Sequence, residues 1–147
     1  MSVDVEPALI DHCFYRQPLG WPEVSDRFPV APMTMMLAMM RDAALTLAPD
    51  RVAIALEDVA ALRWLAVAPA VEVELRCERV ADDAIAVELV GYARATVRVA
   101  AAYPPPPPAR TQPLRAPRAT PISADQLYID RWMFHGPGYA GVTAMGP

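Results

Sequence analysis

The segment Met33 to Leu47 constrains the fold most, because it predicts a helix that is apolar on nearly every side. Pro32 suits the first turn of a helix, Pro49 stops it, and the Met, Leu and Ala residues between them are good helix formers. At 1.5 Å per residue this helix would be about 22 Å long. A helix that is apolar around most of its circumference is expected to be buried, so other parts of the chain must cover it.

The residues after this helix predict an antiparallel sheet of four or five strands, which makes the fold class α+β. Residues Val71 to Val80 alternate apolar and charged side chains, which is typical of a half-buried strand. Residues 1–31 are irregular and rich in proline and aromatic side chains, and they are expected to lie across the sheet or rim a pocket. The other predicted features are strands at Arg51–Val59, Leu62–Val67, Ile85–Val90 and Ala95–Ala100, a turn at Asp82-Asp83, a bulge at Gly91 and a short strand at Ala8–Phe14.

Composition narrows the class of protein. The chain has 147 residues, enough for one ordinary domain with a core, and a net charge of −4 without the basic patch that nucleic-acid binding requires. Cys13 and Cys77 lie far apart without metal-ligand spacing, and the first ten residues lack a basic signal-peptide region, so we expect reduced thiols in a cytoplasmic protein. The apolar run at 32–40 is far shorter than the roughly 20 residues that span a bilayer, so no membrane partner is expected.

Five consecutive prolines, Pro104 to Pro108, predict a boundary. Residues 104–122 form a proline-rich linker of polyproline type, and Ser123 is placed to cap a new helix. The predicted organisation is therefore a folded unit at 1–103, the linker at 104–122 and the start of a second unit at 123–147. We expect this last part to be either poorly ordered or docked back on the first unit.

Several strings in the chain resemble the dehydratase domain of modular polyketide synthases, which consists of two hotdog units. In that family an Asp-His precedes a Pro at the start of the central helix, and Asp11-His12 and Pro32-Met33 stand in those places. The second unit opens with Leu-Tyr and then Tyr-Gly-Pro-x-Phe-x-Gly, which Leu127-Tyr128 and the string 135–141 match. The resemblance implies a hotdog fold, a central apolar helix wrapped by an antiparallel sheet, followed by a truncated second hotdog.

The resemblance also implies a function. The reaction would remove water from 3-hydroxyacyl thioesters on acyl carrier protein to give 2-enoyl thioesters, with His12 as the catalytic base. No metal or redox cofactor is implied, because the substrate arrives on the phosphopantetheine of the carrier protein. The implied partners are the acyl carrier protein, other polyketide synthase domains and a second copy of the chain in a homodimer. The substrate-binding residues implied are Pro32, Met33, Gly136, Pro137 and Tyr139.

Two departures from the family pattern bear on this function. The family spaces its catalytic residues as HxxxGxxxxP, whereas His12 and Pro32 are twenty positions apart. Counting back from Pro32 without a gap places Glu23 at the histidine position and Arg27 at the glycine position. Either an insertion at 16–26 displaces His12, or this unit lacks its base. The catalytic aspartate of the family lies on the helix of the second unit, beyond Pro147, so we expect the chain to be inactive alone.

Other interpretations of the same residues stay open. His12 could be an ordinary polar residue, and His135 either a substrate donor or, more simply, a turn residue before Gly136-Pro137. Asp42 could be the acid that single-unit hotdog dehydratases carry on this helix, or a solvated helix end. The methionines could line an acyl channel or simply fill the core (Met33, Met35, Met36, Met39 and Met40). The alternative functions are a non-catalytic structural or docking hotdog of a megasynthase and a single-hotdog, thioesterase-like dimer.

Overall fold

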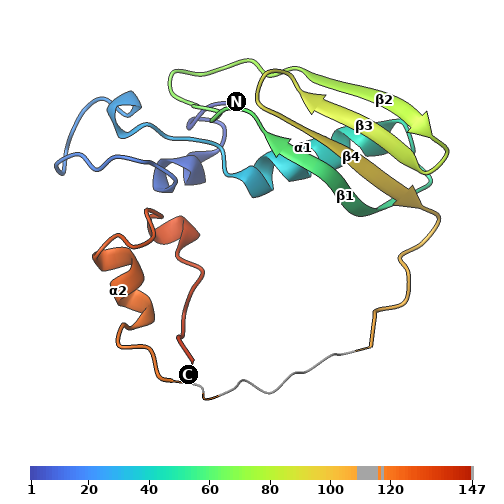
Figure 1. Cartoon of the computed structure of the whole chain (residues 1–147). Helices are drawn as coiled ribbons and strands as arrows, with labels where there is room; N and C mark the ends of the chain where they lie inside the picture. Colours follow the sequence, from blue (N-terminus) through green and yellow to red (C-terminus); the bar gives the residue numbers. More distant parts are fainter. Residues whose placement is uncertain (109–115, 117, 147) are drawn as a thin grey trace.

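The computed structural model describes residues 1–108, 116 and 118–146, and places one long helix, α1 (Met33–Thr46), against one face of a four-stranded antiparallel sheet (Figure 1). The α+β class is therefore confirmed. The sheet has the order β1-β4-β3-β2, and its strands are β1 (Val52–Ala61), β2 (Leu75–Ala81), β3 (Ala84–Leu89) and β4 (Ala93–Ala100). Much of the predicted linker, at 109–115 and 117, lies outside the described residues, as does Pro147.

The core lies between α1 and the inward face of the two central strands. Successive side chains of a strand point to opposite faces, and the inward set on β3 and β4 is apolar and buried. The register places these residues opposite one another as Ile85 and Val97, Val87 and Ala95, and Leu89 and Ala93. Such cross-strand pairs and their burial against the helix fix which face of the sheet points inward.

The helix itself is covered on one side only by the described residues, so the prediction that it is buried all round is wrong. Met36, Met40 and Ala44, spaced four apart on one stripe, are fully buried, whereas Met35, Leu37 and Met39 are half-buried and Arg41 and Asp42 exposed. The physical reason is that a single sheet can contact only one side of a helix. The alternation of buried and half-buried methionines favours core packing for Met36 and Met40 over a role in an acyl channel.

The predicted strands correspond to four observed strands with shifted bounds. Leu62–Val67 is not a strand, because only Ala66 pairs there, in a bridge to Val30. The strand predicted from Val71 begins at Leu75 instead, since the backbone of Val71 pairs with Met1 through two hydrogen bonds of 2.6 and 2.9 Å. Val71 therefore pairs with the first residue of the chain and not with a strand of the sheet.

Three local predictions have different outcomes. The turn at Asp82-Asp83 is confirmed, between β2 and β3. Gly91 (φ +77°) lies in the turn between β3 and β4 and not in a bulge, because the left-handed conformation closes that turn. The irregularities of register occur in the β1–β4 and β2–β3 pairings, whereas β3 and β4, which Gly91 connects, pair without one. The strand predicted at Ala8–Phe14 is also wrong, since Pro7 opens the 3-10 helix η1 (Pro7–Asp11).

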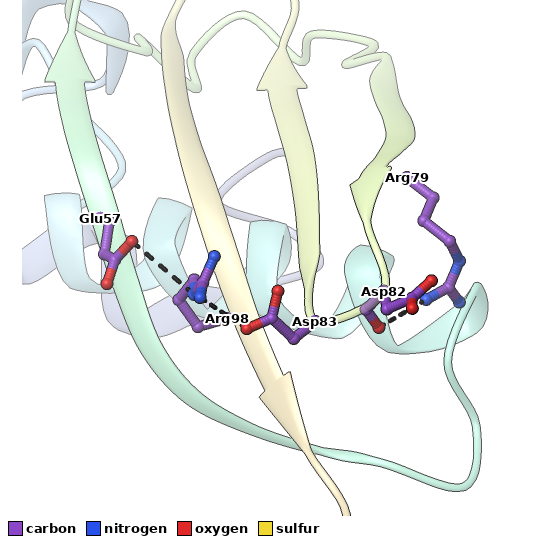
Figure 2. A network of polar contacts seen from close by, with 5 residues as sticks. All are labelled: Glu57, Arg79, Asp82, Asp83 and Arg98. Atoms are coloured by element: carbon purple, nitrogen blue, oxygen red, sulfur yellow. Dashed lines mark hydrogen bonds and ion pairs between the residues drawn. The ribbon is translucent and has the colours of Figure 1, made fainter.

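The outer face of the sheet carries charged side chains in place of a second apolar layer. Figure 2 shows Arg98 of β4 between Glu57 of β1 and Asp83 of the β2–β3 turn, with the nearest atoms 3.8 and 2.5 Å away. In the same view Arg79 reaches the backbone carbonyl of Asp82. These groups are partly exposed, so each pair contributes at most about 1 kcal/mol to stability.

The C-terminal segment, which we define as residues 118–146, lies beside the N-terminal residues and away from the sheet (Figure 1). Its short helix α2 (Ala124–Ile129) begins at Ser123, as predicted, with a capping box in which Ser123 and Gln126 bond each other's backbone N–H groups. The 3-10 helix η3 (Pro137–Tyr139) follows and contacts η1. No helix in the described part of the chain has the length and apolar character needed to cross a membrane.

Candidate functional site

The site begins where two parts of the N-terminal segment pair. The backbone N–H of Phe14 donates to the carbonyl of Phe28 (3.3 Å), and Val30 N–H donates to the carbonyl of His12 (3.1 Å). Residues 16–26 form the loop between these paired stretches, with Glu23 exposed in it. Although eighteen positions separate His12 from Val30, the loop brings them side by side. The loop thus brings His12 next to the residues before α1, whereas Glu23 lies exposed in the loop.

His12 is buried, with 5% of its surface exposed, and its ring is held in one orientation. Its Nδ1 lies 2.8 Å from the backbone carbonyl oxygen of Val30. A carbonyl can only accept a hydrogen bond, so Nδ1 carries the proton and Nε2 keeps its lone pair. Burial lowers the pKa of His12, the neighbouring His135 lowers it further, and the bond to Val30 opposes both. The imidazole is thus neutral near pH 7, with Nε2 available as a base.

The C-terminal segment supplies the rings around His12. The ring centroid of His12 lies 4.9 Å from that of Phe134, 5.2 Å from that of His135 and 5.3 Å from that of Tyr139. His135 stacks on His12 nearly parallel, and Phe134 meets it edge-on. Residues more than 120 positions apart in the sequence therefore form one aromatic cluster. Of the two expectations for the C-terminal segment, the structure agrees with docking.

Asp11 fastens this cluster through two hydrogen bonds. Its carbonyl accepts from the N–H of Gly136 (2.6 Å), and its carboxylate Oδ2 accepts from the N–H of Gly138 (2.8 Å). A Cβ added at Gly136 would lie 2.5 Å from Oδ1 of Asp11 and 2.9 Å from its Cβ. Only glycine at position 136 lets the two backbones approach this closely.

Arg131 makes a further connection between the two ends of the chain. Its Nη2 donates to the backbone carbonyls of Phe14 (3.1 Å) and Cys13 (3.4 Å). Phe14 in turn packs edge-on against Trp64 and against Phe134, with centroids 4.7 and 5.2 Å apart. The site is therefore built from three segments: the paired N-terminal residues, the loop before Leu65 and the C-terminal segment.

The structure brings together some of the predicted site residues and not others. Gly136 meets Asp11 and Tyr139 meets His12, as described above, and Pro137 begins η3, which contacts η1. Pro32 and Met33 stand at the start of α1, where the Pro32 carbonyl accepts from the N–H groups of the first helical turn. These two residues are linked to His12 through the chain, because Val30, two positions before Pro32, is hydrogen-bonded to His12. His135, interpreted as a turn residue, precedes the turn but also stacks on His12, and its Nδ1 is buried without a hydrogen-bond partner.

Sequence reasoning missed several contributors. Asp11 belongs to the Asp-His string, but the sequence does not predict that its carboxylate accepts a hydrogen bond from the N–H of Gly138. No sequence motif around Arg131 predicts its role, which is to donate a hydrogen bond to the backbone carbonyl of Phe14.

Asp42 is exposed and paired with Arg41 at 2.7 Å, which agrees with a solvated helix end. The Cys13 thiol donates to the Ile10 carbonyl (3.0 Å) and burial raises its pKa, which makes it a weak nucleophile.

The described residues contain no group of three or more His, Cys, Asp or Glu side chains arranged to hold a metal ion. Both cysteines are free, with Cys13 buried and Cys77 half-buried. Comparisons with protein families, with curated proteins and with solved structures find no match to this chain.

Proposed function

We propose that this chain is the N-terminal part of a polyketide-synthase dehydratase domain, with a hotdog fold and with His12 as its catalytic base. The substrate would be a 3-hydroxyacyl thioester on acyl carrier protein and the product a 2-enoyl thioester. One observation carries the proposal: a neutral His12 with a free Nε2 lies against the His135–Tyr139 string. These are the two stretches of sequence in which the resemblance to the family was found.

Dehydration of a 3-hydroxyacyl thioester needs a base, and the neutral imidazole of His12 can be that base. Nε2 would accept the proton from the α-carbon of the thioester, and the electron pair left behind would form the new double bond as the β-hydroxyl leaves. A general base must be in its unprotonated form, and it works best when its pKa lies near the working pH. The lowered pKa of His12 keeps the imidazole unprotonated at neutral pH, which meets the first requirement. The hydroxyl needs a proton to leave as water, which the resemblance assigns to an aspartic acid of the second hotdog.

The remaining site residues would position the acyl group. Gly136 and Pro137 line a pocket together with His135, which stacks on His12, and the ring of Tyr139 lies 5.3 Å from the imidazole. Pro32 and Met33 would hold the start of the helix, and with it Val30, in place. Acyl carrier protein, other synthase domains and a second copy of the chain remain the proposed partners, and phosphopantetheine is the proposed carrier of the substrate.

A second candidate is a non-catalytic hotdog that serves as a structural or docking element of a megasynthase. The observation that favours it is the enclosure of His12, which is 5% exposed and faced by three aromatic rings. A thioester reaches Nε2 in this arrangement only if the C-terminal segment moves. In this candidate the imidazole is a packing and hydrogen-bonding residue.

Turnover separates the two candidates. The full reading frame that contains these residues would be assayed for 2-enoyl product with a 3-hydroxyacyl carrier protein, alongside the 147-residue chain alone. We expect the chain alone to show no turnover, since the acid implied by the resemblance is not among its residues. In the full frame, His12→Ala should lower the rate by about 10²- to 10⁴-fold, the usual contribution of a general base.

Asp42→Asn is the matched control, because Asp42 is an exposed residue of α1 that pairs with Arg41 and has no contact in the ring cluster. We expect its turnover to equal that of the unchanged protein. Equal turnover of His12→Ala and the unchanged protein would instead assign the chain to the non-catalytic candidate.

A further inference from the structure

A pocket of about 390 Å³ opens beside the C-terminal segment, and three arginines stand in its wall. Arg16 and Arg27 flank the loop at 16–26, and Arg131 comes from the residues after α2. One carboxylate, that of Asp11, also lines the pocket. The charged groups of the wall are thus three cations against one anion, in a protein whose net charge is −4.

These guanidinium groups are not neutralised by neighbouring carboxylates. In the described part of the chain the ion pairs involve Arg41, Arg76 and Arg98, none of which lines this pocket. Asp11, the one acid of the wall, already accepts the N–H of Gly138. Arg131 uses one nitrogen, Nη2, to donate hydrogen bonds to backbone carbonyls. The site is electropositive and has several N–H donors left over.

Arg27 provides a second, independent observation. Its Nε is buried and has no hydrogen-bond partner. Leaving a buried donor unpaired costs about 1–3 kcal/mol, more for a charged group, and buried polar groups in folded proteins nearly always have a partner. The Nε of Arg27 thus gains no compensating contact within the chain, and the guanidinium stays unpaired at the pocket wall. Arg27, Arg131 and Cys13 line the same pocket, and the two guanidiniums oppose the burial that raises the pKa of the Cys13 thiol.

We propose that this pocket binds a phosphate group that belongs to a phosphate ester. The planar fork of a guanidinium matches two phosphate oxygens at once, and several arginines around one anion give strong, charge-assisted hydrogen bonds. The pocket is far larger than a phosphate alone, and Ile10 and Leu19 give it apolar wall as well. That space suits an organic group attached to the phosphate.

Two sources supply this chemistry. One is the phosphodiester of the phosphopantetheine arm, a source that rests on the proposed dehydratase function. The other is a free phosphate ester, which needs no dehydratase. Phe134, His135 and Gly136 line the same pocket and contact His12 or Asp11, so a bound ester lies beside the ring cluster in either case.

The test is calorimetric titration of the 147-residue chain with inorganic phosphate, 4′-phosphopantetheine and pantetheine. We expect saturable binding of both phosphate compounds, no binding of pantetheine, and weaker binding at higher salt, because charge–charge attraction is screened. An affinity at least tenfold higher for phosphopantetheine than for phosphate identifies the carrier arm as the source. Similar affinities show that the pantetheine part is not recognised and identify a free phosphate ester as the source. Both outcomes support the site, whereas absence of saturable binding by either compound overturns it.

Arginine variants locate the site. Arg16→Gln changes an exposed residue and should leave the fold intact, and the double variant with Arg27→Gln should lose at least tenfold in phosphate affinity. Arg41→Gln, an exposed arginine of α1, is the matched control and should bind as the unchanged chain does. Thermal unfolding followed by circular dichroism verifies that each variant is folded. Unchanged affinity in Arg16→Gln and in the double variant would overturn the assignment. Phosphate binding is measured without turnover, so it stands even if no dehydration is found.

Discussion

The sheet with α1 and the C-terminal segment are held by different physical means, although they meet in one molecule. In the sheet and helix, side chains such as Leu89 and Met40 are fully buried against many neighbours. In the C-terminal segment, Ile129 and Trp132 are 68% and 73% exposed, and attachment rests on a few directed contacts to Asp11, His12 and Phe14. The first region gains its stability from burial spread over many residues, and the second depends on single residues.

The largest effect in this comparison should come from emptying the core of the sheet. Leu89→Ala removes a side chain with no exposed surface between β3 and α1, and such a cavity costs about 2–5 kcal/mol. Ile54→Ala in β1, where 41% of the residue is exposed, is the matched control and should cost less than about 1 kcal/mol. Chemical denaturation followed by circular dichroism measures both. Similar costs for the two variants would mean that the core is elsewhere.

The next effect should detach the C-terminal segment while the sheet stays folded. Gly136→Ala places a methyl group 2.5 Å from the Asp11 carboxylate, so the bond between Gly136 N–H and the Asp11 carbonyl is lost. Gly141→Ala is the control, because its added Cβ meets nothing within 4 Å. Hydrogen exchange by mass spectrometry should show loss of protection at residues 134–140 in Gly136→Ala alone. Protection equal to that of Gly141→Ala would show that the ring contacts suffice without Asp11.

The same contrast explains what could be predicted from the sequence. Alternation of apolar side chains and helix-forming composition act over neighbouring residues, so α1, the turn at Asp82-Asp83 and the Ser123 cap were all predictable. The strand bounds were less so, since the pairing of Val71 with Met1 depends on where a distant chain end lies. Periodicity also indicated a buried helix, but one sheet covers only one side of it.

The candidate site could be predicted only in the two strings of sequence that resemble a known family. The resemblance picked out His12, Gly136, Pro137 and Tyr139 from two separate strings, and the structure places the two strings together. No local pattern marks the Val30 carbonyl that fixes the tautomer of His12, because it lies eighteen residues away across a loop. The arginine-lined pocket could not be predicted for the same reason, since its lining residues come from separate segments of the chain.

A smaller effect should appear as a pH dependence of stability at the junction of the two regions. Burial is the main reason why the pKa of His12 in the folded chain lies below its ordinary value of 6.5. At a pH between the folded pKa and 6.5, the unfolded chain therefore binds more protons than the folded chain. Stability contributed by neutral His12 is therefore complete above about pH 6.5 and is lost as the pH falls through the lowered pKa. Melting temperatures measured from pH 7.5 down to about pH 5 should decrease, and His12→Gln should flatten this part of the curve. An identical slope in that variant would assign the protons to other groups.

The smallest expected effect is on the outer face of the sheet, where charge replaces burial. Arg98 bridges Glu57 and Asp83 across β1, β4 and the β2–β3 turn, yet all three side chains are partly exposed (Figure 2). Ion pairs at such sites are screened by water and salt, so Arg98→Gln should cost less than about 1 kcal/mol, and this cost should shrink in high salt. The measurement is denaturant unfolding at low and high sodium chloride concentration. A cost near that of Leu89→Ala would show that directed contacts also stabilise the sheet, which would remove the distinction between the two regions.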